Sequence, residues 1–319
     1  MLSAFVLAAL TALTPLSDTI SPVHLPGAEE SSREALAAVH NQARRIVPLG
    51  GGRYLVVYPP RRNNLAGALM RGETVNEMPY IVVPSAALPQ SARTSQDGGQ
   101  MLDAALLDKS FAVSATALPV KGNTSGIIFY DFGPDFEPNP TLAVRLQGCV
   151  GAIAAGPGSS VLALTDSGIT IVSRDGVVLG QLLKDAAGCD DQITRVDASR
   201  YAVYDAAKQQ VTLFRLAVGK QQIAGKGPDW RDADYTAAPV ADATVEKTVD
   251  VSEGATAPVK SLHVDKDGNI YLVRDNVVLR FAGTSAQSWK SGRDWSSVYW
   301  DGDTLVALTK NAHWERVRF

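Results

Sequence analysis

A unit of four short apolar runs joined by tight turns most constrains how this chain can fold. It is clearest over residues 150–182, where the runs are 150–154, 161–164, 169–172 and 177–182. Short apolar runs between Gly, Pro, Asp and Ser are typical of β-strands. Turns of two or three residues pair such strands antiparallel. The segment therefore predicts a four-stranded antiparallel sheet.

Similar units recur towards the C-terminal end of the chain, over 193–224, 261–289 and 297–319. The gap between the first two of these units is about twice the usual step, and a degenerate unit through Trp230 and Tyr235 would fill it. A period of about 36 to 40 residues with four strands per unit is typical of a β-propeller. The stretch 45–319 has room for about seven such blades, with six or eight as the alternatives.

A propeller is also what the physical chemistry of such units favours. A single four-stranded sheet has two apolar faces and cannot bury both of them alone. Blades stacked around an axis bury these faces, and closure of the ring protects the strand edges. We therefore expect an all-β propeller of about seven four-stranded blades, closed by pairing of the C-terminal strand with the strand near Tyr54.

Helical signals are confined to two places. Ser31 and Glu34 form an S-x-x-E capping box before an Ala-rich run, which predicts one short helix ending near Arg44. A further turn or two of helix is expected at 101–107, which reads MLDAALL. The chain is therefore divided into a linker with a helix at 17–44 and a propeller at 45–319.

The N-terminal segment 1–16 is apolar, and no Lys or Arg occurs before Arg33. Its length suits a secretory signal or a membrane anchor, whose usual basic start would then lie upstream of Met1. It is short for a full membrane span. A buried core helix and an interfacial anchor are the alternatives. We expect export to the periplasm or the cell surface, with membrane association through this segment.

The two cysteines support export. Cys149 and Cys189 each precede the first turn of neighbouring units by a similar distance, so they should face each other on adjacent blades. An even, sparse cysteine count is compatible with one disulfide in an oxidising compartment. Two free buried thiols are the alternative.

The segment Asp265–Phe281 reads DKDGNIYLVRDNVVLRF. It resembles the repeat cores of NHL-type and YncE-type propellers, in which a D-x-x-G-N-[IL]-[YW] hairpin recurs once per blade. The resemblance implies the fold and says little about activity, because propellers host enzymes, ligand binders and scaffolds. The chain is also similar to the periplasmic polar-growth propellers of mycolic-acid bacteria, in its expected export, its Ala/Gly-rich composition and its bare propeller. That similarity implies a part in trehalose-mycolate trafficking.

Motifs for chemistry are weak in this sequence. Asp265, Asp267 and Asn269 look like a calcium loop, but the twelfth position is Asn276 where a bidentate Glu is needed, so a hairpin turn is favoured. The motifs G-x-S-x-G and H-E-x-x-H are absent. His263 falls in the middle of a predicted strand. It either faces the central channel or has a structural role. The pair Asp190–Asp191 is read as a solvated loop, with acid–base chemistry as the alternative.

These observations predict no catalytic residue, no metal and no cofactor. The net charge is −3 and no Lys/Arg-rich block occurs, which makes nucleic acid an unsuitable partner.

The tryptophans are the most unusual feature, because all five fall after position 229. Trp230 lies in a long polar segment, 226–236, together with Arg231 and Tyr235. Trp295 lies beside two charged residues. Exposed tryptophans often mark recognition surfaces, whereas wedging between blades is the structural alternative. We predict that Trp230, Arg231, Tyr235 and Trp295 bind a ligand or partner.

The preferred function is a non-catalytic binding or scaffold propeller of the cell envelope. Its partner would be an amphiphilic lipid or an envelope membrane protein, in lipid trafficking or cell-wall growth. The alternative is a propeller enzyme of the lyase, glycosidase or quinoprotein type. An enzyme should bring several His, Arg, Asp or Glu side chains together at the channel mouth. A binder should show an apolar cleft or patch with an aromatic rim.

Overall fold

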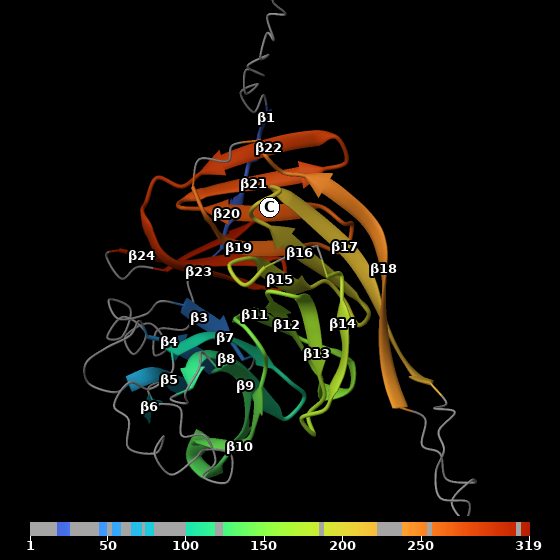
Figure 1. Ribbon diagram of the computed structural model, residues 1–319. Coiled ribbons are helices and arrows are strands. Elements are labelled where there is room, and N and C mark those ends of the chain that lie inside the picture. Colours follow the sequence, from blue (N-terminus) through green and yellow to red (C-terminus); the bar gives the residue numbers. More distant parts are fainter. Residues whose placement is uncertain are drawn as a thin grey trace, which may run out of the picture.

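The computed structural model describes residues 18–25, 45–49, 53–58, 65–71, 74–79, 100–118, 124–184, 188–221, 238–253, 257–310 and 314–319. These residues form six antiparallel blades arranged in a ring (Figure 1). Within each blade, strands adjacent in the chain pair with each other, as tight turns dictate.

The blades are numbered in chain order. Blade 1 holds β3 (Arg45–Pro48), β4 (Arg53–Val57), β5 (Leu65–Arg71) and β6 (Thr74–Pro79); blade 2 holds β7 (Gln100–Leu106), β8 (Ser110–Leu118), β9 (Thr124–Phe132) and β10 (Pro138–Arg145); blade 3 holds β11 (Val150–Ala155), β12 (Val161–Thr165), β13 (Gly168–Val172) and β14 (Val178–Leu182). Blade 4 holds β15 (Gln192–Arg195), β16 (Arg200–Asp205), β17 (Gln210–Gln221) and β18 (Ala238–Asp250); blade 5 holds β19 (Val259–Val264), β20 (Ile270–Arg274), β21 (Val277–Ala282) and β22 (Ser285–Lys290); blade 6 holds β23 (Trp295–Asp301), β24 (Thr304–Thr309) and β25 (Trp314–Arg318).

The core lies between the blades. The described residues contain six clusters of buried apolar side chains, one at each junction of neighbouring blades around the ring. The second strand of a blade is sandwiched on both faces, which is why β12 and β24 are continuous runs that are buried at every position. Burial of both faces is what the repeat pattern requires, so the propeller fold is confirmed.

The number of blades differs from the prediction of about seven, because the structure has six. The extra unit predicted between 193–224 and 261–289 is not found among the described residues. Instead, β17 and β18 pair from Gln210 with Asp250 to Gln221 with Ala238, so that blade 4 is longer than its neighbours. The fourth strand of this blade is β18, which lies beyond the predicted unit 193–224.

The long hairpin is visible as the yellow and orange ribbon along one side of the ring (Figure 1). The strand β16 pairs with β17 only from Arg200 to Asp205. The remainder of β17 and β18 is therefore a two-stranded ribbon that continues past the blade. Its flank is supported by blade 3, since Ala241 is buried and approaches Gly180 of β14.

The predicted helical turn at 101–107 is wrong, because this segment forms β7, the inner strand of blade 2. Ala and Leu favour helix locally, but here Met101 and Ala105 are buried in the clusters on the two faces of the blade. The helix predicted to end near Arg44 lies outside the described residues. The described residues contain no α-helix, only the short 3₁₀ turns η3 (Pro134–Phe136) and η4 (Pro157–Ser159).

The ring closes differently from the expectation that used the strand near Tyr54. The strand β2 (Val23–His24) pairs with β25 and supplies the fourth strand of blade 6. Both edges of β4 are already paired with β3 and β5, whereas the outer edge of β25 is open to an N-terminal strand. Just upstream, β1 (Asp18–Thr19) adds a parallel fifth strand to blade 5. Residues 18–25 thus span the junction of blades 5 and 6.

The segment 1–16, expected to be a signal or anchor, lies outside the described residues. Within the part of the chain that is described, no helix combines the length and the apolar character needed to cross a membrane.

Candidate functional site

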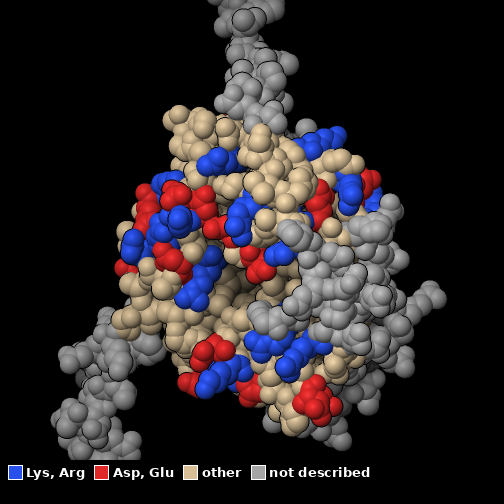
Figure 2. Space-filling view, turned by 180° about the vertical axis from the view of Figure 1, so that it is seen from behind, with Lys and Arg blue, Asp and Glu red and all other residues tan. Residues whose placement is uncertain are grey.

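The inner strands of the blades enclose a cavity of about 320 Å³ at one end of the channel, which we call the channel mouth. It is lined by the beginnings of inner strands from five blades, and its principal residues are Asp103, Gly151, Cys189, Asp190, Asp191 and Lys260. The space-filling view shows one face of the molecule hollowed near its centre, with charged side chains of both signs around the hollow (Figure 2).

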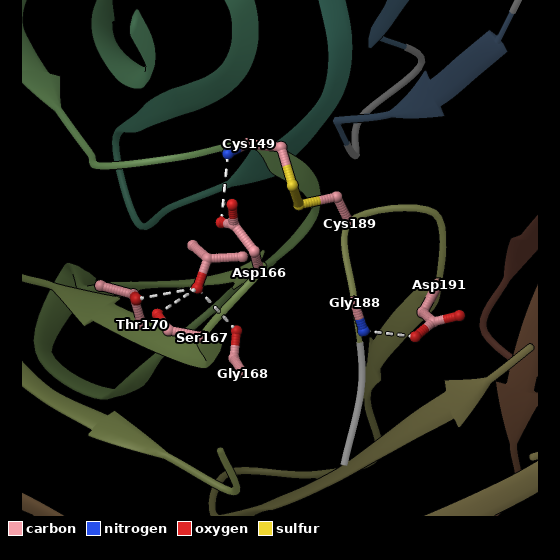
Figure 3. Close-up of a disulfide and its surroundings, with 9 residues drawn as sticks. Cys149, Asp166, Ser167, Gly168, Thr170, Gly188, Cys189 and Asp191 are labelled. Carbon is pink, nitrogen blue, oxygen red and sulfur yellow. Dashed lines mark hydrogen bonds between the residues drawn. A yellow bond between two sulfur atoms is a disulfide. The ribbon is translucent and has the colours of Figure 1, made fainter. Parts of the chain in front are cut away.

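A disulfide closes one side of the channel mouth. Cys149 precedes β11 and Cys189 precedes β15, and their Cα atoms lie 6.1 Å apart (Figure 3). The predicted pairing is therefore confirmed, and it joins blades 3 and 4. The Cys149 N–H donates to the carboxylate of Asp166 at 3.1 Å. Because such bonds persist in oxidising compartments, the disulfide is consistent with an extracytoplasmic location.

Cys149, Asp166 and Cys189 have the spacing of metal ligands. Both sulfur atoms are joined to each other, so the group is a disulfide beside a carboxylate.

The wall of the mouth depends on a glycine. A Cβ atom added to Gly151 would lie 1.9 Å from the carbonyl oxygen of Cys189, a distance that no side chain can occupy. The strand β11 and the loop before β15 therefore approach each other by backbone alone. This close approach brings Asp190 and Asp191 to the rim of the channel.

The buried carboxylates of the mouth are bound to backbone N–H groups. Asp103 accepts hydrogen bonds from Ala104 at 2.8 Å and from Ile153 at 2.9 Å, which links blades 2 and 3. Asp191 accepts from the N–H groups of Gly188 and Ala206. Burial raises the pKa of Asp191 above its ordinary value. Both side chains thus serve to fix the backbone around the channel.

The other polar groups of the mouth are less constrained or already paired. Asp190 is exposed. Lys260 lies 3.4 Å from Asp275. Ser296 donates its hydroxyl to the carbonyl oxygen of Leu308 at 2.9 Å. Among the described lining residues, no nucleophile lies in hydrogen-bond contact with a free base.

A second cavity, of about 180 Å³, lies between blades 5 and 6 where β19 and β23 end. We call it the seam pocket, and its principal residues are His263, Tyr271, Trp300, Asp303, Arg318 and Phe319. The His263 ring stacks on Trp300 with centroids 4.5 Å apart, and its Nε2 lies 3.2 Å from a carboxylate oxygen of Asp303. Burial lowers the pKa of His263, although Asp303 opposes this.

The seam pocket is bordered by a rigid turn that the sequence predicted. The Asp265 carboxylate accepts hydrogen bonds from the backbone of Asp267 and from the backbone and side chain of Asn269, at 2.8–2.9 Å. Gly268 takes a φ of +80°, which a glycine adopts without strain. The segment therefore forms the hairpin turn that the sequence predicted, between the antiparallel strands β19 and β20.

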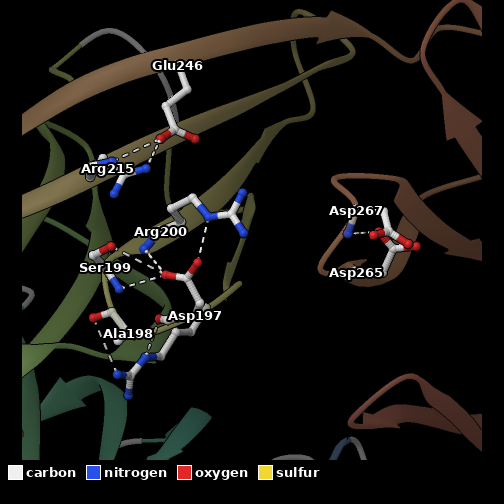
Figure 4. A network of polar contacts seen from close by, with 9 residues as sticks. Asp197, Ala198, Ser199, Arg200, Arg215, Glu246, Asp265 and Asp267 are labelled. Atoms are coloured by element: carbon white, nitrogen blue, oxygen red, sulfur yellow. Dashed lines mark hydrogen bonds and ion pairs between the residues drawn. The ribbon is translucent and has the colours of Figure 1, made fainter.

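Blade 4 has the same kind of aspartate-bonded turn at the equivalent position. The Asp197 carboxylate accepts from the N–H groups of Ser199 and Arg200, both at 2.8 Å, and from the Arg200 side chain (Figure 4). These bonds, led by that from Ser199, hold the pKa of Asp197 well below its usual range. The aspartates that follow inner strands are thus turn-formers in both blades.

Of the four predicted binding residues, the structure describes one. Trp230, Arg231 and Tyr235 lie outside the described residues, and their roles stay predictions. Trp295 is 3 % exposed, packs between blades 5 and 6, and donates from Nε1 to Glu315 at 2.7 Å. Its position is the one that inter-blade packing requires, and its part in binding stays a prediction.

Sequence reasoning missed Trp300, Asp303 and Phe319 as residues of one pocket. A usable signal existed, because Trp300 immediately precedes the Asp-Gly-Asp turn 301–303, just as His263 precedes the turn 265–269. Two polar turns on adjacent blades, each preceded by an aromatic ring, indicate a shared site at that end of the ring.

The described residues form an all-β, six-bladed propeller with one disulfide. No model of a known protein family and no curated protein matches it. The resemblances to NHL-type, YncE-type and polar-growth propellers therefore stay predictions.

Several solved structures are similar in shape. YCF48 bound to D1 peptide has 11% identity and a TM-score of 0.46, over 98% of this chain and 100% of that one. Virginiamycin B lyase from Staphylococcus aureus has 10% identity and a TM-score of 0.42, over 94% and 99%. The Pan2 WD40 domain of Neurospora crassa has 12% identity and a TM-score of 0.42, over 87% and 89%.

Proposed function

We propose that this protein is a non-catalytic binding propeller of the cell envelope, which holds its ligand or partner at the channel mouth. The observation that carries the proposal is the bonding of the buried channel carboxylates. Asp103 and Asp191 each accept from two backbone N–H groups. A general base needs a free acceptor within reach of a substrate proton. Oxygens committed to the backbone favour a fixed frame for binding over acid–base chemistry.

The proposed partner is an amphiphilic lipid or an envelope membrane protein. The disulfide supports an oxidising compartment, and the apolar segment 1–16 supports a position at a membrane. The polar segment 226–236 would add to the contact through Trp230, Arg231 and Tyr235. The described ribbon of β17 and β18 ends at Gln221 and Ala238, the residues that flank this segment.

The direct test is mass spectrometry of the lipids and proteins that co-purify with the full chain from native envelope membranes. Asp190→Lys reverses an exposed charge at the mouth and should abolish retention of the partner. Asp175→Lys is the matched control, because Asp175 is also an exposed turn residue and lies outside the mouth. Equal retention by the two variants would contradict the proposal.

The Trp230→Ala variant tests the segment 226–236 separately. The free energy of unfolding should stay within about 1 kcal/mol of the wild type, as for a surface residue. Binding of the co-purified partner should weaken by about 2 kcal/mol, the size of a hot-spot residue. If the variant unfolds readily, Trp230 is a packing residue. Turnover of a substrate that one polar channel substitution abolishes would establish the enzyme alternative.

A further inference from the structure

The seam pocket has an aromatic floor that the proposed function does not use. The rings of Tyr271, Trp300 and Phe319 form one cluster, in which the ring centroids lie 5.5 to 6.2 Å apart. Tyr271 is buried, whereas Trp300 and Phe319 keep part of their surface exposed. The planes of these two rings are inclined at 53° to each other, so they form an angled apolar wall of the pocket. Such a wall suits a ligand that has one apolar face.

The rim of the pocket is polar and carries both signs of charge. Lys266 and Asp267 come from the turn after β19, Asp303 comes from the turn after β23, and Arg318 comes from the end of β25. Ammonium and guanidinium groups donate hydrogen bonds, and carboxylates accept them. His263 does not favour the positively charged form, because burial lowers its pKa. A ligand with several hydroxyl groups finds both kinds of partner on this rim.

The charge and size of the pocket exclude the simpler ligand classes. A phosphate-like anion would meet the carboxylates of Asp267 and Asp303. A compact cation would meet Lys266 and Arg318 on the same rim. A lipid chain with its headgroup needs more room than about 180 Å³. A neutral ring of about one sugar unit meets none of these objections.

We infer that the seam pocket binds a neutral sugar ring. The C–H face of the ring lies against Trp300 and Phe319, and its hydroxyl groups donate to Asp303 and accept from Arg318. The site is separate from the channel mouth, because it lies where β19 and β23 end, whereas the mouth lies where these strands begin.

The pocket is formed before a ligand arrives. The Asp265 turn is held by hydrogen bonds from Asp267, Asn269 and the Tyr271 hydroxyl. The contact of His263 with Asp303 ties β19 of blade 5 to the rim turn of blade 6. Pre-formed sites lose less entropy on binding, so even a small ligand can gain affinity here.

The N-terminal strand supports the same site. Arg318 pairs in register with Val23 of β2, so the end of β25 that carries Arg318 is held in place from its outer side. The N-terminal segment 18–25 thus positions the rim as well as closing the ring. For this reason the test uses the full chain.

The experiment is saturation-transfer NMR of the full chain with glucose, mannose and N-acetylglucosamine at millimolar concentration, followed by titration of the best ligand. Transfer should be strongest at the ring C–H protons. Asp303→Asn removes a charged acceptor from the rim and should weaken binding by about tenfold or more. Asp301→Asn is the matched control, because Asp301 is an exposed residue of the same turn that does not line the pocket. It should leave binding unchanged.

Three results would overturn the inference: no transfer to any of the three sugars, equal weakening by the two variants, or competition by choline or inorganic phosphate at the same concentration. Asp190→Lys at the channel mouth should keep full sugar binding. Failure at one cavity is therefore distinguishable from failure at the other.

Discussion

The two cavities of this propeller are built from similar residue types in opposite ways. At the channel mouth, Asp103 is 1 % exposed and both of its oxygens accept from backbone N–H groups. At the seam pocket, the Asp303 side chain is 61% exposed, and its one polar contact among the described residues is with the His263 ring. A buried carboxylate bound to backbone determines where strands lie. An exposed carboxylate beside aromatic rings keeps acceptor capacity for a ligand.

For the same reason, substitutions at the two cavities should differ in their effect on the stability of the protein. The mouth is cross-linked by the disulfide and by bonds between blades, so substitutions of its buried, bonded residues should lower the stability of the protein. The rim of the seam pocket is carried on surface turns, so substitutions there should change binding more than stability. The predictions below test this division.

The largest effect is expected from removing the disulfide. The double variant Cys149→Ser and Cys189→Ser releases a loop with a sequence separation of 40 residues. In the loop-entropy model this lowers the free energy of unfolding by about 3–4 kcal/mol. Urea denaturation of the variant and of the wild type checks the value. Reduced wild-type protein should match the variant, and thiol labelling that finds two free thiols in unreduced wild type would contradict the cross-link.

A smaller effect is expected from the acidic pair at the mouth. Asp191→Asn replaces one acceptor oxygen by a donor that faces the N–H of Gly188 or Ala206, which should cost about 1–3 kcal/mol. Asp190→Asn is the matched neighbour, since Asp190 is exposed, and it should stay within about 0.5 kcal/mol. Thermal unfolding of both variants checks the difference. Equal losses would show that the two carboxylates share one role.

Local patterns in the sequence predicted the fold well wherever strands are joined by tight turns. The runs expected at 150–182 correspond to β11, β12, β13 and β14 with shifts of one residue. The pattern failed at β17 and β18, because Gln221 and Ala238, which pair, are separated by a stretch longer than a two- or three-residue turn. It also failed at β7, because burial on both faces overrides the helix preference of Ala and Leu.

The candidate sites were predictable to different degrees for a related reason. Cys149 and Cys189 occupy equivalent positions on adjacent blades, so the repeat itself brings them together. The seam pocket combines the ends of β19, β23 and β25, and β25 is positioned by a strand from the opposite end of the chain. The repeat period predicts neighbouring blades, but it does not state which strand closes the ring. Phe319 therefore could not be joined to Trp300 and Asp303 from spacing alone.

The smallest expected effect is a pH dependence that originates at His263. Its pKa is lowered in the folded protein, chiefly by burial, with Asp303 and Asp265 acting in the opposite direction. The unfolded chain, with the ordinary pKa of 6.5, then binds the proton more readily than the folded chain. Acidification therefore favours unfolding. The free energy of unfolding should fall as the pH is lowered through 6.5 towards the folded-state pKa.

His263→Gln isolates this contribution. The variant keeps a polar group near Asp303 but does not titrate, so its stability should change less over the same pH range. Urea denaturation of wild type and variant at a series of pH values gives the difference curve, in which the titrations of groups that do not interact with His263 cancel. If the wild type instead becomes more stable on acidification relative to the variant, the ion pair with Asp303 outweighs burial. The seam pocket would then gain a positive charge on acidification, and its rim would favour an anion over a neutral sugar.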